Sequence, residues 1–208
     1  HKSVEVLNDK DLLIKQIIRV GKGCLSYLVC SNSTKECFII DPSKFIEEYI
    51  ELAKENGLKI IGIIETHVHA DHLSGAMALT EITKTKYYVS GVDLKAKIDF
   101  FDLNNIKELK IGDNTIKLIK TPGHTDGSVC LLINNIALLT GDTLFLDGVG
   151  RPDLGRDKEE IEKGAKMLHS TLKKIKDMDS SLIILPAHFK DYIKLPICEK
   201  LGTLLNKN

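Results

Sequence analysis

The sequence predicts an α/β protein in which helices cover the outer faces of two β-sheets. Short apolar runs typical of strands alternate with segments of helical periodicity, and this succession occurs twice along the chain. Several runs are apolar throughout, which suits strands covered on both faces. A chain of 208 residues is also long enough to bury a core of its own. We therefore expect a single domain over residues 1–208.

The first half of the chain begins with three predicted strands. They lie at residues 14–20, 24–30 and 37–40, where β-branched and apolar residues are separated by Gly, Asn and Ser. A helix is expected from Ser43, a candidate N-cap, to Gly57, a candidate C-terminal stop, because apolar residues recur at helical spacing between them. The apolar run at residues 60–64 predicts a fourth strand, buried inside a sheet.

The second half has a similar order of elements, although the two halves do not align as a repeat. Further strands are predicted at residues 87–89, 115–119, 128–133, 136–139 and 182–185. Gly112-Asp113 and Asn134-Asn135 are typical of tight turns between strands. A long amphipathic helix is expected to begin near Asp157, and a last helix is expected over residues 197–205 with Pro196 at its start.

Charge and composition exclude several classes of partner. Lys plus Arg equals Asp plus Glu at 29 each, so the chain lacks the basic excess that nucleic acids or anionic membranes require. No apolar run approaches the roughly 20 residues that span a bilayer. The five cysteines form no Cys-x-x-Cys pair, which favours buried thiols in a reducing compartment. The beginning of the sequence lacks a signal-peptide pattern, so we expect a cytoplasmic protein.

The densest cluster of candidate metal ligands directly follows the strand predicted at residues 60–64. Residues 66–72 are Thr-His-Val-His-Ala-Asp-His, which places three histidines and an aspartate within six residues, namely His67, His69, Asp71 and His72. Imidazole and carboxylate together suit zinc, iron or manganese. The alternative is a solvated polar loop, which is disfavoured because four ligand-type side chains stand directly after an apolar strand.

Three later positions have the same placement at the end of a predicted strand. His124 lies in Thr-Pro-Gly-His-Thr, Asp142 in Thr-Gly-Asp-Thr, and His188 in Pro-Ala-His. Any one of them alone would most often be an ordinary hydrogen-bonding turn residue. Strand ends that carry only His and Asp can converge at one edge of the sheets, and such a constellation is a candidate active site.

The order His-x-His-x-Asp-His at residues 67–72, followed by His124, Asp142 and His188, resembles the metallo-β-lactamase superfamily over nearly the whole chain. The resemblance implies a four-layer αββα sandwich with the metal centre at one edge of its sheets. In dinuclear members, the position matching Asp142 bridges the two ions. The other ligands of the first ion occupy the positions of His67, His69 and His124, and those of the second occupy the positions of Asp71, His72 and His188.

Two further segments narrow the resemblance to two groups of enzymes. Residues 66–75 and 122–128 resemble both glyoxalase II and the persulfide dioxygenases. The Gly-Arg-Pro-Asp-Leu at residues 150–154 resembles the persulfide dioxygenases, whereas glyoxalase II usually has Lys and aromatic residues there. Glyoxalase II also carries a helical C-terminal extension, but only twenty residues follow His188 here, room for one helix.

The resemblance therefore favours a non-haem iron enzyme that oxidises a thiol persulfide with O2 to sulfite and the free thiol. It implies one Fe(II) held at the positions of His67, His124 and Asp142, which leaves coordination positions open for substrate and O2. The remaining candidates would surround this ion and orient ligands and water, namely His69, Asp71, His72 and His188. Among them, Asp71 and His72 are the candidate catalytic residues. The same ligand set also fits Zn(II) in the isolated protein. It can hold one ion or two.

Other readings of the sequence remain open. A glyoxalase II-type thioester hydrolase with a dinuclear zinc or iron site is the main alternative. A non-catalytic module is disfavoured, because it would have no physical need for a complete ligand set. The sequence leaves open the thiol carrier and the oligomeric state, with a homodimer among the options. Arg151 either pairs with a substrate carboxylate or forms an ion pair with Asp153 or Asp157.

Overall fold

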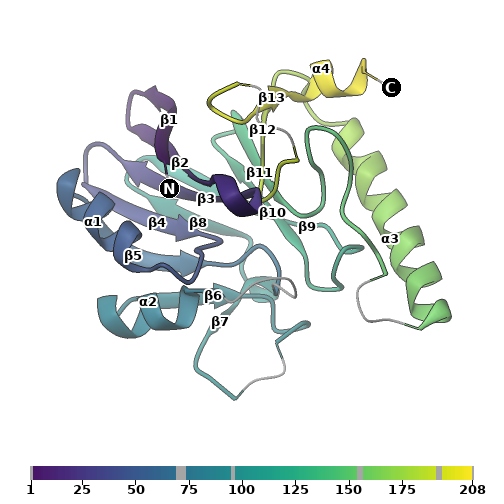
Figure 1. The fold of residues 1–208 in the computed structure, drawn as a ribbon, viewed down its shortest axis with the longest axis horizontal. Helices are drawn as coiled ribbons and strands as arrows, with labels where there is room; N and C mark the ends of the chain where they lie inside the picture. The colour runs from purple at the N-terminus through teal and green to yellow at the C-terminus, as the bar shows by residue number, and fades with distance from the viewer. Residues whose placement is uncertain (1, 69–73, 95–96, 154–156, 191–193, 208) are drawn as a thin grey trace.

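A computed structural model describes residues 2–68, 74–94, 97–153, 157–190 and 194–207, and it contains two β-sheets packed face to face (Figure 1). The first sheet has the order β1-β2-β3-β4-β5-β6-β7 and the second the order β13-β12-β11-β10-β9-β8. The strands of the first sheet are β1 Lys2–Asp9, β2 Leu12–Arg19, β3 Cys24–Ser31, β4 Glu36–Ile40, β5 Lys59–Ile64, β6 Lys86–Val89 and β7 Phe101–Asp102. Those of the second are β8 Glu108–Ile111, β9 Asn114–Lys120, β10 Val129–Ile133, β11 Ala137–Gly141, β12 Ile183–Pro186 and β13 Glu199–Lys200.

Helices cover the outer face of each sheet (Figure 1). The α-helices are α1 Glu47–Glu55, α2 Ala76–Thr83, α3 Lys158–Lys176 and α4 Leu201–Leu205, and two 3₁₀ turns lie at Val20–Lys22 and Leu103–Asn105. Helices α1 and α2 pack on the first sheet, and α3 and α4 lie against the second. None of the helices in the described part of the chain is both long and apolar enough to cross a lipid bilayer.

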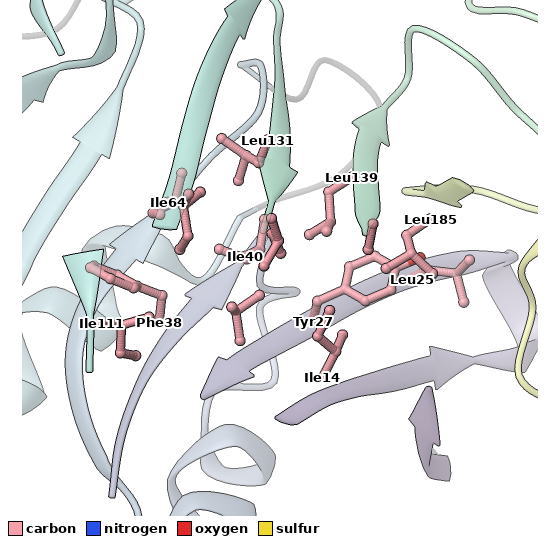
Figure 2. Close-up of a cluster of buried hydrophobic side chains, with 14 of the residues drawn as sticks. Ile14, Leu25, Tyr27, Phe38, Ile40, Ile64, Ile111, Leu131, Leu139 and Leu185 are labelled. Carbon is pink, nitrogen blue, oxygen red and sulfur yellow. The ribbon is translucent and has the colours of Figure 1, made fainter. Parts of the chain in front are cut away.

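Three apolar interfaces lie between these layers. The largest lies between the sheets, where Tyr27 and Phe38 of the first sheet face Leu131 and Leu139 of the second (Figure 2). The other two lie between each sheet and its own helices. Successive residues of β10 alternate between the inner and outer interfaces, which is why this strand is apolar throughout. The predicted αββα sandwich is confirmed.

The sheet topology brings several strand ends to one edge of the sandwich. Strands β4, β5 and β6 run parallel in the first sheet, and β11 and β12 run parallel in the second. The remaining neighbours in the second sheet are antiparallel. Loops that follow parallel strands emerge at their carboxyl ends, where α/β proteins place their ligands. His67 follows β5, Asp142 follows β11 and His188 follows β12, whereas His124 follows the antiparallel strand β9.

Most predicted boundaries agree with the structure within a few residues. Asp157 caps α3 by accepting a hydrogen bond from the backbone N–H of Glu160. Gly57 adopts a left-handed conformation one residue beyond Asn56, the C-cap of α1. Both expected turns are present, since Gly112, Asn134 and Asn135 have positive φ angles that suit tight hairpins.

Two helix boundaries predicted from the sequence are wrong. Ser43 is not the N-cap of α1, because it forms a bridge with Ser74 and the helix begins four residues later at Glu47. The last helix does not start at Pro196. Residues 199–200 pair with β12 instead, so α4 covers only residues 201–205.

Candidate metal centre

Three side chains from separate loops converge at the edge where the parallel strands end. His67 follows β5, His124 follows β9, and Asp142 comes directly after β11. Their exposed fractions are 1%, 7% and 8%, so all three are buried. Each offers a donor atom that lies within 4.8 Å of the other two. The sequence placed these three residues at one metal ion, and the structure brings them together.

The distances between the donor atoms fit a small divalent cation. The Nε2 atoms of His67 and His124 lie 3.6 Å and 3.5 Å from Oδ2 of Asp142. Two bonds of about 2.1 Å at a tetrahedral angle place their donor atoms about 3.4 Å apart. The two imidazole rings meet edge to face with centroids 5.1 Å apart, and each brings its Nε2 atom close to Oδ2 of Asp142.

A buried chain of hydrogen bonds fixes which nitrogen of His67 faces the candidate metal position. The hydroxyl of Thr66 donates to Oδ2 of Asp41 at 2.7 Å, and the Thr66 backbone N–H donates to Oδ1 at 2.7 Å. Because a threonine hydroxyl has a single proton, the 3.0 Å contact between Thr66 Oγ1 and Nδ1 of His67 requires the imidazole to donate. Nε2 is therefore the nitrogen with the lone pair, as a metal ligand requires.

The backbone gives His124 the same tautomer. Its Nδ1 lies 2.9 Å from the carbonyl oxygen of Arg151, which can only accept, so Nδ1 carries the proton. The loop before His124 packs tightly on α3, since a Cβ on Gly123 would lie 2.5 Å from the Cα of Leu168. Gly123 also has a φ of +148°, which L side chains rarely adopt. Glycine at this position thus sets where His124 lies.

His188 reaches the same site as a hydrogen-bond partner of Asp142. Its Nδ1 donates to Oδ1 of Asp142 at 2.5 Å, on the other side of the carboxylate from His67 and His124. Burial alone would raise the pKa of Asp142, but this bond and the nearby His67 hold it well below its usual range. Burial alone would lower the pKa of His188, but Asp142 raises it to about 10. The carboxylate is therefore anionic.

Glycine also allows the loops of Asp142 and His67 to approach each other. Gly141 ends β11 with a φ of +50°, in the left-handed region. A Cβ on Gly141 would lie 2.4 Å from Oγ1 of Thr66, within the hydrogen-bond chain that orients His67. Any larger residue would displace Thr66 or strain the turn.

The remaining predicted site residues divide into two groups. His69, Asp71 and His72 lie outside the described residues, so their assignment stays a prediction. Arg151 forms a paired ion contact with Asp153, in which Nε and Nη2 lie 2.9 Å and 3.1 Å from the two carboxylate oxygens. This confirms the ion-pair interpretation of its guanidinium, which is exposed to solvent.

Sequence reasoning missed two contributors to the site. Asp41 directly follows β4, and the Asp-Pro pair that it begins indicates only the end of a strand. Arg151 contributes through its carbonyl oxygen, and no side-chain pattern marks such a contact. The signal that the sequence offers for Asp41 is the Thr66 hydroxyl next to His67, because that hydroxyl needs an acceptor.

The donor set itself indicates a class of protein. Two neutral imidazoles and one carboxylate carry a single negative charge, and this set suits Fe(II), Zn(II) or Mn(II). A buried centre of this kind, at the strand ends of an αββα sandwich, is typical of a metal-dependent enzyme. The chain belongs to the metallo-beta-lactamase superfamily, whose family model matches residues 19–188.

Two groups of curated relatives are similar to the chain. It is 30% identical to the mitochondrial persulfide dioxygenase ETHE1 of Mus musculus over 190 residues, which cover 89% of this chain and 71% of the relative. It is 32% identical to the cytoplasmic hydroxyacylglutathione hydrolase of Saccharomyces cerevisiae over 136 residues, which cover 60% of this chain and 49% of the relative. The resemblance to both groups is confirmed at the level of the family.

Solved structures agree with the fold. A metallo-beta-lactamase from Staphylococcus aureus superimposes with a TM-score of 0.84 at 30% identity, covering 95% of this chain and 62% of that protein. ETHE1 from Myxococcus xanthus superimposes with a TM-score of 0.78 at 25% identity, covering 91% and 80%. The chain thus spans less than two thirds of the staphylococcal protein.

Proposed function

We propose that the protein is an Fe(II)-dependent persulfide dioxygenase that converts a thiol persulfide, O2 and water into sulfite and the free thiol. The observation that carries this proposal is the buried trio of His67, His124 and Asp142. Two histidines and one carboxylate are the ligand set of non-haem Fe(II) oxygenases, in which open positions accept substrate and O2. The similarity to persulfide dioxygenases over 89% of the chain supports the same activity.

The proposed reaction balances as RSSH + O2 + H2O → RSH + SO3²⁻ + 2H⁺. The outer sulfur loses four electrons and O2 accepts them, while the S–S bond breaks and the inner sulfur leaves as the thiol. When bound, Fe(II) supplies a centre on which the persulfide and O2 can react despite the spin barrier between them.

The residues of this chain hold and orient the centre. Asp142 supplies the negative charge that offsets a divalent ion, and the bonds to His67 Nδ1 and His124 Nδ1 fix both imidazoles in the tautomer that a ligand needs. His188 holds the second oxygen of Asp142, which sets the rotation of the carboxylate. We assign Asp71 and His72 the task of orienting water, as the family resemblance implies.

A thioester hydrolase with two metal ions is the second candidate, because the yeast hydroxyacylglutathione hydrolase is also similar to this chain. Two ions and a bridging hydroxide would serve hydrolysis instead of oxidation. The Gly-Arg-Pro-Asp-Leu at residues 150–154 favours the dioxygenase.

Loading the protein with iron under anaerobic conditions tests the proposal. We expect oxygen uptake and sulfite release with the persulfides of glutathione or coenzyme A, and weak or no hydrolysis of S-lactoylglutathione. Asp142→Asn should abolish oxygen uptake, because the amide keeps the shape but removes the charge. Asp9→Asn is the matched control, since that carboxylate is exposed at the end of β1 and belongs to none of the loops that carry the metal ligands. Brisk thioester hydrolysis without oxygen uptake would establish the hydrolase instead.

The number of ions separates the two candidates independently of turnover. In a site with one ion, His188→Ala removes a partner of Asp142, and such a change typically costs about 10–100-fold in metal affinity or activity. We expect about one iron per chain in both the parent protein and His188→Ala when saturated, measured by elemental analysis. Two ions in the parent that fall to one in His188→Ala would contradict the dioxygenase.

A further inference from the structure

Two cysteines lie opposite each other on neighbouring strands of the first sheet. Cys30 is near the end of β3 and Cys37 near the start of β4, and these antiparallel strands pair side by side (Figure 1). The two residues are direct partners in the register of that pairing. Both side chains are fully buried in the apolar cluster on the outer face of the sheet, which also contains Tyr49 of α1. The pair takes no part in the metal centre.

The hydrogen bonds of the sheet decide how close the two side chains come. The backbone N–H of Asn32 donates to the carbonyl oxygen of Asp11 at 2.7 Å, so the pair of β3 and β2 residues that they flank is a non-hydrogen-bonded pair. The pattern alternates along a strand, so the next residue, Cys30, directs its backbone bonds to β2. Towards β4, Cys30 and Cys37 are therefore a non-hydrogen-bonded pair, in which Cα atoms are about 4.5 Å apart. A disulfide fits Cα separations of about 4.4–6.8 Å.

The two thiols interact directly. A hydrogen bond with Cys30, together with burial, holds the pKa of the Cys37 thiol well above its usual range. Such a thiol stays protonated and reacts slowly while the sheet is closed. The pair lies close to the end of the hairpin, where Ser33, Thr34 and Lys35 are exposed and the pairing of β4 with β5 shifts its register. Local opening of this end is the route by which a small reagent reaches the thiols.

We propose that Cys30 and Cys37 are a redox pair that hydrogen peroxide converts into a cross-strand disulfide. In the first step the O–O bond breaks as one thiol becomes a sulfenic acid, Cys-SH + H2O2 → Cys-SOH + H2O. In the second step the opposite thiol attacks that sulfur, and the S–O bond breaks as the S–S bond forms and a second water leaves. Two electrons pass from the two sulfurs to one peroxide. Small thiols reverse the reaction by exchange.

The position of the second thiol determines the product. A sulfenic acid without a nearby thiol is oxidised further to a sulfinic acid, whereas one that faces a thiol condenses with it. Among the described strands, this is the one register pair made of two cysteines. Cys24 bridges to His188, and Cys130 lies in the outer interface of the second sheet. Six residues of extended strand, about 20 Å, separate Cys24 from the pair.

Peptide mapping of the full-length chain tests the proposal. Zinc is loaded in place of iron, because iron would itself react with peroxide. Trypsin cleaves after Lys35, so the two cysteines fall on separate peptides, residues 23–35 and 36–44. After treatment of the folded protein with hydrogen peroxide, we expect a non-reducing digest to contain these peptides joined through Cys30 and Cys37. Dithiothreitol should separate them again.

Thermal unfolding tests whether the disulfide fits the native sheet. Because an unstrained cross-link restricts the unfolded chain, the oxidised protein should unfold about 5–10 °C above the reduced protein. Cys37→Ala should give neither the joined peptides nor the rise, and Cys30 should be oxidised to the sulfinic acid instead. Cys130→Ala is the matched control, since that cysteine is equally buried, and it should keep both. If a variant fails to fold, the comparison of oxidised and reduced parent protein still decides.

Three outcomes would overturn the proposal. They are a pair that stays reduced in the folded protein, sulfinic acids at both positions without joined peptides, and a cross-linked protein that unfolds at a lower temperature than the reduced one. The zinc-loaded chain is tested without any persulfide. Success or failure of the redox pair is therefore independent of the proposed dioxygenase activity.

Discussion

At the residue scale, the orientation of His67 depends on two side chains that are not metal ligands. Asp41 and Thr66 are 5% and 1% exposed, and their hydrogen bonds decide which nitrogen of His67 faces Asp142. The sequence could predict His67, His124 and Asp142 because each follows an apolar run. It could not predict Asp41, which lies 25 residues from Thr66 and meets it only after β4 and β5 have paired.

Thr66→Val should weaken metal binding about 10–100-fold, because valine has nearly the same shape but no acceptor for Nδ1 of His67. Thr66→Ser keeps the hydroxyl and should bind metal close to the parent affinity. Competition with a chelator of known affinity measures both variants. Equal affinities for the valine and serine variants would show that the hydroxyl does not position His67.

At the scale of elements, strands buried on both faces were the easiest to predict. Strand β10 is apolar throughout, and β3, β5 and β11 are largely apolar, because the inner and outer layers both exclude water. Strand β1 escaped prediction because its side chains are largely exposed or only partly buried, so no apolar run marks it. Helix α2 was missed because it is eight residues long and directly follows the histidine-rich segment.

The contact between the His124 loop and α3 gives a prediction at this scale. Gly123→Ala should destabilise the protein by about 1–3 kcal/mol, because alanine is strained at a φ of +148° and its Cβ would meet the α3 backbone. It should also lower metal affinity by shifting His124. Thermal unfolding and chelator competition measure the two effects.

Gly21→Ala serves as the control for Gly123→Ala. A Cβ on Gly21 would meet nothing within 4 Å, so its stability should change by no more than about 0.5 kcal/mol. Parent-like stability and affinity in Gly123→Ala would mean that α3 does not hold this loop.

At the scale of the whole molecule, buried polar bonds as well as apolar packing join the two sheets. The hydroxyl of Tyr27 on β3 donates to the carbonyl oxygen of Pro186 on β12 at 2.6 Å. Gln16 on β2 exchanges two hydrogen bonds of 2.8 Å with the backbone of Ile197. The Tyr27 bond ties the first sheet to the strand that leads to His188, and the Gln16 bonds hold the segment before β13 against the same sheet.

Tyr27→Phe should destabilise the metal-free protein by about 1–3 kcal/mol, because it leaves the buried carbonyl of Pro186 without its donor. Tyr88→Phe is the matched control. Tyr88 is also buried, but among the described residues its hydroxyl makes no hydrogen bond, so the change should be within about 0.5 kcal/mol. Urea unfolding of chelator-treated protein measures both, and equal losses would contradict the role given to the Tyr27 hydroxyl.

The central claim is that one divalent ion lies between His67, His124 and Asp142, and anomalous diffraction from crystals of the iron-loaded protein tests it most directly. We expect a single iron peak, bonded to Nε2 of both histidines and to Oδ2 of Asp142 at about 2.0–2.2 Å. An iron held by a different trio, with any of these three side chains turned away, or two iron peaks of equal height, would contradict the account.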